Sequence, residues 1–218
     1  MNAFRAELED RRWLSDKTFE VELTHPPDFS FTAGQRIRVE HAAAEREYSL
    51  ISAPTDSVLT LCIRLVKNGF FTPFLSTVRP GTQLHFTGPH GYFTYRTTDR
   101  QAVFIATGTG IAPFVSMARS GIRGFILLHG VLNERELYYA DLWREVAALY
   151  VPCVSHPDRS GDPALYVSEG RVTDVINDVL TGETYDFYLS GKGGMITEMT
   201  HRIDESYPGS KIYTEIFF

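Results

Sequence analysis

The chain has 218 residues, of which 43% are hydrophobic, and its formal net charge at pH 7 is −6. This length and hydrophobic fraction allow one large domain or two small ones with a buried core, and they exclude a disordered chain. Residues 1–98 carry 11 basic and 11 acidic side chains and residues 99–218 carry 10 and 16, so the negative charge belongs to the second part. An acidic surface repels phosphate, which argues against nucleic acid as a partner.

The N-terminal dozen residues carry several charged side chains and no apolar block, and no apolar run approaches the ~20 residues that cross a membrane. We therefore expect a cytoplasmic protein with no membrane span. The two cysteines, Cys62 and Cys153, lack the spacing of a zinc or iron–sulfur site, so we expect no metal. If electrons leave singly, their cluster lies elsewhere.

Up to about residue 96 the sequence runs in short β-rich segments separated by glycine and proline turns. The expected strands are Phe19–Leu23, Arg36–Glu40, Tyr48–Ile51, Leu59–Leu65 and Gln83–Thr87. Several short strands at this spacing predict a small antiparallel β-barrel, which we expect to have six strands over residues 1–98.

From about residue 99 apolar strands alternate with helical stretches. The expected strands are Ala102–Ala106, Gly124–His129, Tyr150–Val154 and Tyr185–Leu189, and the expected helices are Pro113–Arg119, Glu136–Ala148 and Val172–Leu180. This alternation predicts parallel βαβ units, and therefore a Rossmann-like α/β domain over residues 99–218.

A glycine turn follows the first apolar strand of the second part. It consists of Thr107, Gly108, Thr109 and Gly110, and Ile111, Ala112 and Pro113 open a helix behind it. Backbone N–H groups of such a turn can approach a pyrophosphate, and the helix N-terminus adds favourable partial charge. The spacing is not the full G-x-G-x-x-G, so a plain strand-to-helix turn is the alternative.

A second glycine turn follows the apolar strand that ends at Leu189. It reads Ser190, Gly191, Lys192, Gly193, Gly194 and Met195. Ligands of open parallel sheets bind beyond the carboxyl ends of the strands, so two glycine turns at two such ends predict one crevice. Core packing is the alternative reading for Met195.

Two segments of the first part have the chemistry of a flavin site. In Arg46-Glu47-Tyr48-Ser49 a strand places Arg46 and Tyr48 on one face, where a guanidinium can bind a pyrophosphate and a phenol ring can lie against a conjugated ring. Residues 68–73 form a glycine turn whose N–H groups and Thr72 hydroxyl can cradle phosphate. A surface arginine beside a packed tyrosine, and an ordinary turn before a short helix, are the alternatives.

In this order the segments resemble the motifs of the ferredoxin–NADP reductase superfamily over nearly the whole chain. The matching stretches are REYS at 46–49, NGFFT at 68–72, GPHGYF at 88–93, TGTGIAP at 107–113 and SGKGGM at 190–195. The resemblance implies bound FAD and a nicotinamide dinucleotide, NADP or NAD. The flavin would accept hydride and release electrons one at a time, while the protein positions it and tunes its potential.

The resemblance also implies roles for individual residues. For the flavin, Arg46 would hold the phosphates, Tyr48 would pack on the ring, Ser49 would lie near N5, and Gly69, Phe70, Phe71 and Thr72 would bind pyrophosphate. For the nicotinamide nucleotide, Thr107 to Pro113 would bind it, and Gly191, Lys192 and Met195 would flank its ring. At the C-terminus, Glu215, Phe217 and Phe218 would cover the flavin and control access to it. A C-terminal edge strand that packs on the sheet is the alternative, and both can hold together.

Two departures from the family pattern matter. The first is Ser190, which stands where the family usually has cysteine. With the roles that the resemblance implies, the catalytic candidates are Ser49, Ser190 and Glu215. Ser155, His156 and Arg159 occupy the region of the family's 2′-phosphate site, but Asp158 beside them could instead bind a ribose hydroxyl as NAD sites do. The coenzyme choice therefore stays open, and an exposed turn is the alternative.

The leading hypothesis is an enzyme that moves electrons between NAD(P)H and a separate one-electron carrier, ferredoxin or flavodoxin, through FAD. A second hypothesis is a flavin-bearing subunit of a larger redox complex. A third is a nucleotide-sensing module with a degraded site, which only Ser190 motivates.

Overall fold

The computed structural model describes residues 2–42, 44–158, 165–181 and 184–217. The chain divides into two compact units: Met1–Tyr95 with Ala112–Gly121, and Arg96–Ile111 with Ile122–Phe218. The boundary predicted after residue 98 falls in the polar stretch just beyond Tyr95. This stretch is held by the second unit, where the buried Asp186 accepts a hydrogen bond from Thr98 Oγ1 at 2.6 Å.

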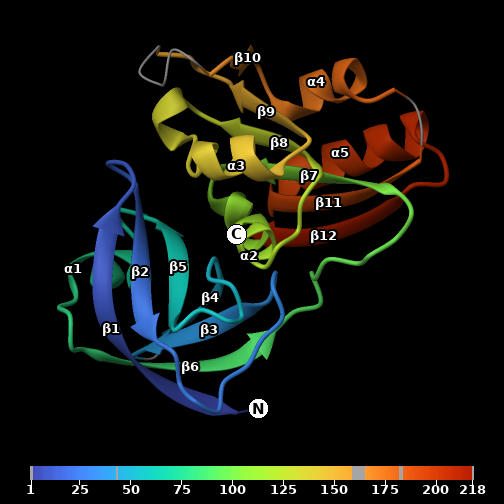
Figure 1. Ribbon diagram of the computed structural model, residues 1–218. Helices are drawn as coiled ribbons and strands as arrows, with labels where there is room; N and C mark the ends of the chain where they lie inside the picture. The colour runs from blue at the N-terminus through green and yellow to red at the C-terminus, as the bar shows by residue number, and fades with distance from the viewer. Residues whose placement is uncertain (1, 43, 159–164, 182–183, 218) are drawn as a thin grey trace. The chain divides into compact units, whose positions relative to one another are not determined.

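The first unit is an antiparallel β-barrel, as predicted (Figure 1). Its strands are β1 (Ala3–Trp13), β2 (Thr18–Thr24), β3 (Arg36–His41), β4 (Ala44–Ser49), β5 (Val58–Arg64) and β6 (Gln83–His90). They hydrogen-bond in the order β4-β3-β6-β1-β2-β5. Beyond the end of β4, Leu50 bridges to Leu61 of β5, which joins the two edges of the sheet.

Strand β1 is absent from the expected elements, although it lies between β6 and β2 in the sheet. Only Ala6 and Leu8 are buried along its 11 residues, and most of the others are exposed. The apolar alternation of Phe4, Ala6 and Leu8 stops there, so pairing with two neighbours stabilises the remainder of the strand.

Helix α1 (Phe71–Thr77) contributes Phe71 and Leu75 to the barrel core. Helix α2 (Ala112–Arg119) also belongs to this unit. Its Ser116 hydroxyl donates to the Ser52 carbonyl at 2.6 Å, and Phe114 packs on Phe93 with ring centroids 5.7 Å apart.

The second unit is a six-stranded parallel sheet, which confirms the predicted α/β class (Figure 1). Its strands are β7 (Gln101–Thr107), β8 (Ile126–Val131), β9 (Leu149–Val154), β10 (Ser168–Glu169), β11 (Tyr185–Lys192) and β12 (Lys211–Phe217). The order is β10-β9-β8-β7-β11-β12, so the chain first builds outward from β7 and then returns to its other side. The point of reversal lies between β7 and β11, where open α/β sheets bind ligands.

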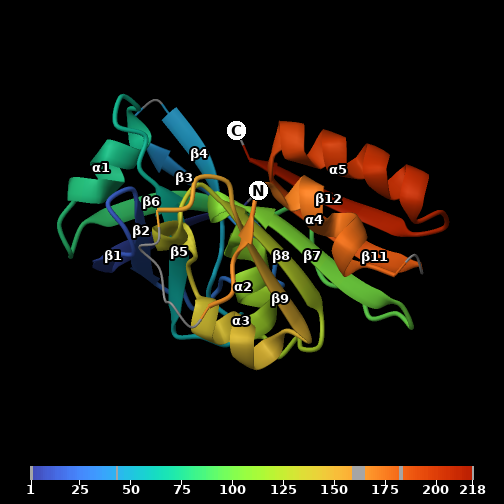
Figure 2. The same cartoon turned by 90° about the horizontal axis from the view of Figure 1, so that it is seen from above.

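Helices cover both faces of this sheet (Figure 2). Helices α4 (Val172–Val179) and α5 (Gly193–Ser206) pack with inward residues of β7, β8 and β11 into one core cluster. On the other face α3 (Ala140–Val146) brings the fully buried Trp143 to 6.3 Å from Phe125, measured between ring centroids.

Two helices differ from expectation. The helix predicted over Glu136–Ala148 is present but shorter, because α3 covers only Ala140–Val146. A 3-10 turn η2 (Glu134–Glu136) precedes it, and Tyr139 between them has a left-handed backbone with φ 62°. Helix α5 was not predicted, since its opening glycine pair has a low helix propensity. No helix within the described residues is long and apolar enough to cross a membrane.

Candidate functional site

The two glycine turns of the second unit meet at the carboxyl ends of β7 and β11. The first turn is the 3-10 segment η1 (Gly108–Ile111). A Cβ on Gly110 would lie 2.5 Å from the Ser190 carbonyl oxygen and 2.7 Å from Gly191 Cα. Such distances are far inside van der Waals contact, so only glycine allows the two backbones to lie against each other.

The contact is reciprocal. Gly191 has φ +136°, and a Cβ there would overlap the Thr107 hydroxyl. That hydroxyl accepts a hydrogen bond from the Lys192 N–H at 3.1 Å. The structure thus brings Thr107 and Gly110 of the first turn against Gly191 and Lys192 of the second, although the two turns lie more than 80 positions apart in the sequence.

Gly108 faces open space. It has φ +53°, and a Cβ at this position would meet nothing within 4 Å. The turn is therefore crowded on the side of Gly110 and open at Gly108. An exposed glycine backbone at the end of a parallel strand suits the close approach of a pyrophosphate.

Ser190 and Glu215 are direct neighbours across β11 and β12, where they pair in register. On the other side Ser190 pairs with Ala106 of β7. Ser190 is fully buried, and among the described residues its hydroxyl oxygen has no hydrogen-bond partner. A buried hydroxyl without a partner is costly, so this oxygen fits contact with a polar group of a ligand.

His129 is a site residue that the sequence analysis did not single out. It is fully buried on β8, and its Nε2 lies 3.2 Å from the Gly108 carbonyl oxygen. Because a carbonyl only accepts, Nε2 carries the proton and the ring is the neutral Nε2–H tautomer. Desolvation lowers the pKa of His129 to about 4, although the bond to Gly108 opposes this. The neutral imidazole therefore holds the first glycine turn by donating a hydrogen bond to the Gly108 carbonyl.

Four predicted contact residues of the second site are buried in hydrophobic packing. Met195 is only 5% exposed and belongs to the core cluster beneath α4 and α5, which is the alternative that the sequence left open for it. Ala112 and Pro113 are buried in α2 and belong to the first unit. Ile111 is also fully buried. Direct nucleotide contacts of these side chains stay predictions.

The predicted 2′-phosphate region follows β9. The Ser155 hydroxyl donates to the Val131 carbonyl at 3.3 Å, and His156 is exposed with Nδ1 3.3 Å from that hydroxyl. The Asp158 N–H donates to the Glu134 carboxylate at 2.9 Å. Two carboxylates therefore lie in the loops after β8 and β9. Arg159 lies outside the described residues.

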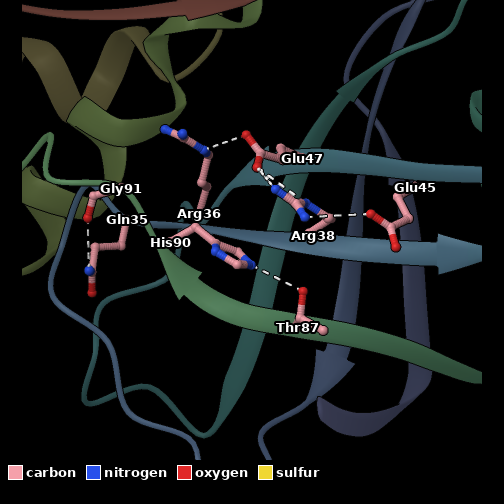
Figure 3. A network of polar contacts seen from close by, with 8 residues as sticks. All are labelled: Gln35, Arg36, Arg38, Glu45, Glu47, Thr87, His90 and Gly91. Carbon is pink, nitrogen blue, oxygen red and sulfur yellow. Dashed lines mark hydrogen bonds and ion pairs between the residues drawn. The ribbon is translucent and has the colours of Figure 1, made fainter. Parts of the chain in front are cut away.

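In the first unit, β3 and β4 form a hairpin with two different faces. Glu45 and Glu47 lie on one face, where they pair with Arg36 and Arg38 of β3 (Figure 3). Arg36 Nε lies 2.6 Å from Glu47, and Arg38 lies 2.8 Å from Glu47 and 3.5 Å from Glu45. Burial raises the pKa of Glu47, but the bonds and charges of Arg38 and Arg36 outweigh it and lower that pKa below its usual value. This face is consequently neutralised within the hairpin.

The opposite face carries Arg46 and Tyr48, as the strand periodicity predicts. Arg46 is exposed, and its Nη1 donates to the Glu45 carbonyl at 2.7 Å. Tyr48 packs against Phe71 with ring centroids 6.1 Å apart. Desolvation raises the pKa of Tyr48 well above its usual value, opposed by the charge of Arg46, so the phenol is neutral at physiological pH. An exposed guanidinium beside a neutral aromatic ring fits a flavin with its phosphates.

Ser49 ends β4 and is buried. The loop before α1 is closed by Thr72, whose hydroxyl accepts the Val66 N–H at 2.8 Å. Gly69 completes this turn, since a Cβ there would lie 3.0 Å from the Val66 carbonyl oxygen. The Thr72 hydroxyl thus orders the loop, whereas its contact with a phosphate stays a prediction. Phe71 is buried, but Phe70 is 62% exposed.

Other features of the described chain lie apart from these turns. A cavity of about 810 Å³ lies between the end of α3, the start of β9 and the end of α4, and contains none of the predicted site residues. Within the described ranges, no group of three or more His, Cys, Asp or Glu side chains could hold a metal ion. Glu215 and Phe217 lie on β12, and Phe218 is outside the described residues.

Two family models match the chain. The oxidoreductase FAD-binding domain matches residues 6–95, and the oxidoreductase NAD-binding domain matches residues 104–201. The first therefore covers the barrel strands with Arg46 and Tyr48, and the second covers both glycine turns.

Among curated proteins, the chain is similar to the toluate 1,2-dioxygenase electron transfer component of Pseudomonas putida. It is 27% identical over 216 residues, which is 92% of this chain and 63% of that protein. It is 32% identical to the reductase component of the naphthalene 1,2-dioxygenase system of the same organism, over 83% of this chain and 57% of that protein. The chain thus spans about three fifths of the length of these relatives.

The fold is also that of a ferredoxin NADP⁺ reductase from Neisseria gonorrhoeae solved with bound FAD and NADP. The TM-score is 0.86 at 19% identity, and all of both chains is covered. The two domain matches, in the order expected from the motifs, and this shared fold agree. The chain belongs to the ferredoxin reductase-like superfamily of FAD- and NAD-binding oxidoreductases.

Proposed function

We propose that this protein is a flavin-dependent oxidoreductase that moves electrons between NAD(P)H and a one-electron protein carrier, ferredoxin or flavodoxin, through bound FAD. The observation that carries the proposal is the close packing of the two glycine turns at the switch point of the parallel sheet, where Gly110 meets Ser190 and Gly191. That arrangement serves a dinucleotide, and it follows an FAD-binding domain in the same chain.

Bound flavin supplies the chemistry, because it takes a hydride from nicotinamide and passes electrons on singly. The chain supplies binding and orientation. Arg46 balances phosphate charge, and Tyr48 offers a neutral aromatic surface. On the nucleotide side, Gly108 leaves room for the pyrophosphate, while the Ser190 hydroxyl on β11 and the neighbouring Glu215 on β12 are the polar groups beside it. The catalytic roles of Ser49, Ser190 and Glu215 are part of the proposal.

NADH is the coenzyme that the described loops favour. Glu134 and Asp158 place two carboxylates after β8 and β9, and Glu134 fixes the loop through the Asp158 N–H. A 2′-phosphate would be repelled there, whereas a ribose hydroxyl can donate to a carboxylate. Among the described residues of these loops, Arg135 and His156 are exposed cations that oppose this preference.

The carrier and the compartment are also proposed. Relatives are electron transfer components of dioxygenase systems, which supports a separate protein as acceptor. Basic side chains of the barrel unit could contact an acidic carrier. Arg36 and Arg38 are paired with glutamates, so Lys67 and Arg79, which are both exposed, are the candidates that we propose. We place the protein in the cytoplasm, where NAD(P)H and such carriers are available.

An anaerobic stopped-flow experiment on the flavin-loaded protein tests the proposal. The visible flavin spectrum is followed after mixing with NADH and, separately, with NADPH. Rapid bleaching by NADH and slower bleaching by NADPH are the expected results. A bound flavin that neither coenzyme bleaches would refute the reductase, and faster bleaching by NADPH would refute the coenzyme assignment alone.

The alternative is a flavin-bearing electron-transfer subunit of a larger redox complex. The relatives named as components of multi-protein systems favour it. Purification from native extract separates the two, since a subunit copurifies with stoichiometric partner chains and a free reductase does not.

A further inference from the structure

A row of polar side chains runs along one face of β11. Asp186, Tyr188 and Ser190 alternate along this strand, and its register with both neighbouring strands is unbroken, so the three side chains lie on the same side of the sheet. The apolar residues between them, Phe187 and Leu189, belong to the core cluster on the opposite face. Ser190, whose buried hydroxyl has no partner among the described residues, is the last member of this row.

The segment before β7 binds the first two members of the row. Asp186 is only 1% exposed; it accepts a hydrogen bond from the Thr98 hydroxyl at 2.6 Å, and Arg100 Nη1 lies 3.4 Å from its other oxygen. The Tyr188 hydroxyl accepts a hydrogen bond from the Arg96 N–H at 3.0 Å. These bonds fix the segment along β11, with Arg96 at the end nearest to the two glycine turns.

Arg96 also contacts the neighbouring strand. Its guanidinium carbon lies 4.9 Å from the centroid of the Tyr213 ring on β12. Tyr213 pairs in register with Tyr188, and their rings stack with centroids 4.7 Å apart and an interplanar angle of 28°. A cation over an aromatic ring is attracted by the quadrupole of that ring. Arg96 therefore joins two strands, since its backbone N–H binds β11 and its side chain binds β12.

Strand β12 needs such contacts because it lies at the edge of the sheet. Among the described strands it hydrogen-bonds only to β11, and a strand with one neighbour opens locally more easily than a central strand. Glu215 lies two positions after Tyr213, so both side chains share one face of β12. Glu215 is 5% exposed and pairs with Ser190. The contact that holds Tyr213 on β11 consequently also holds the Glu215 carboxyl group next to Ser190.

We propose that Arg96 is a positioning residue for hydride transfer, because it holds β12 on β11 through Tyr213 and so keeps Glu215 beside Ser190. The inference rests on the proposed function and extends it to a residue outside both glycine turns. The hydride moves with its two electrons from the nicotinamide to the flavin, and Arg96 gives or takes neither a proton nor an electron. It acts on geometry, to which the rate of such a step is sensitive.

The test measures hydride transfer and nucleotide binding separately. Anaerobic stopped flow, with the coenzyme that bleaches the wild-type flavin faster, gives the limiting bleaching rate and the dissociation constant of that coenzyme. Arg96→Met keeps the length of the side chain and removes its charge. It should lower the limiting rate by about 2- to 30-fold, the range for one lost cation–π contact, and leave the dissociation constant unchanged.

Two further variants serve as controls. Arg96→Lys should keep most of the rate, because an ammonium group over a tyrosine ring is also attracted to it. Arg5→Met removes the same charge from an exposed side chain on β1, in the other unit, and should leave the rate unchanged. An unchanged rate in Arg96→Met, or an Arg96→Lys protein as slow as Arg96→Met, would overturn the proposal.

A double-mutant cycle separates positioning of Glu215 from a general structural effect. Glu215→Gln should itself slow hydride transfer, and adding Arg96→Met should then lower the rate no further, because the effect of Arg96 passes through Glu215. A rate that Arg96→Met lowers by the same factor in both backgrounds would contradict this path. A Glu215→Gln protein with the wild-type rate would contradict it as well.

Hydrogen exchange followed by mass spectrometry examines the strand directly and needs no activity. The peptide that contains β12 should exchange about 2- to 30-fold faster in Arg96→Met than in Arg5→Met, whereas peptides from β7 and β8 should exchange equally. Equal exchange of β12 in the two variants would refute the positioning of this strand. A wild-type flavin that neither coenzyme bleaches would instead refute the proposed function, and the exchange of β12 would still decide whether Arg96 holds the strand.

Discussion

The buried imidazole of His129 makes the stability of the second unit depend on pH. Desolvation lowers its pKa in the folded chain to about 4, from the usual 6.5 that it regains on unfolding. Between these values the unfolded chain binds more protons than the folded one, so the free energy of unfolding rises with pH in this window. With these two pKa values, the part linked to His129 falls by about 2 kcal/mol between about pH 7.5 and about pH 5.

The variant that isolates this effect is His129→Gln. A glutamine amide can still donate to the Gly108 carbonyl, which His129 Nε2 meets at 3.2 Å, but it does not titrate. The variant should therefore lose about 2 kcal/mol less than the wild type over the same pH interval. His129→Leu should show the same reduced pH dependence, but it should be less stable at every pH, because it removes the donor to a buried carbonyl.

Urea unfolding followed by tryptophan fluorescence measures this quantity. The chain has two tryptophans, Trp13 in the first unit and the fully buried Trp143 in the second. In a Trp13→Phe background the signal reports the second unit alone, which matters because two units need not unfold in one step. Equal pH dependence with and without the His129→Gln substitution would refute the buried neutral histidine.

Three further outcomes follow from the site. Gly110→Ala places a Cβ 2.5 Å from the Ser190 carbonyl oxygen, so it should lower the free energy of unfolding by about 1–3 kcal/mol and weaken NADH binding. Thermal melting and nucleotide titration measure these two effects, and a variant that shows neither would contradict the close packing. Glu134→Gln should raise the NADPH-to-NADH ratio of kcat/KM by about fivefold, the effect of about 1 kcal/mol of surface charge; an unchanged ratio removes Glu134 from coenzyme choice. Deletion of Phe217 and Phe218 should alter the hydride-transfer rate or nucleotide affinity in stopped flow, and unchanged kinetics would end their proposed role.

Local sequence pattern was sufficient wherever the signal lay within a few residues. The apolar run before Thr107 and the glycine turn after it predict a strand and a close backbone approach, because glycine alone tolerates that geometry. The alternation around Arg46 and Tyr48 likewise places both on one face of a strand. The change of rhythm near residue 99 separates the antiparallel class from the parallel one, and the structure confirms both.

Local sequence pattern did not predict the elements whose structure depends on tertiary contacts more than on the propensity of their own residues. In strand β1 the apolar alternation ends at Leu8, and the rest of the strand is held by its two neighbours in the sheet. The helix predicted over Glu136–Ala148 is interrupted because Tyr139 adopts a left-handed backbone, which the apolar spacing does not reveal. Helix α5 begins at Gly193 and Gly194, so its start looks like a loop in the sequence.

The sequence by itself determined the two chemistries of this chain, since each motif is a run of neighbouring residues whose backbone and side-chain requirements are local. Only the tertiary structure decided which residues from distant parts of the chain pack against these motifs. The packing of Gly110 on Ser190, the bond from His129 to Gly108 and the stacking of His41 on Phe74 each join residues more than 20 positions apart. Such contacts depend on strand order and register, which arise from the burial of the whole core and not from any one segment.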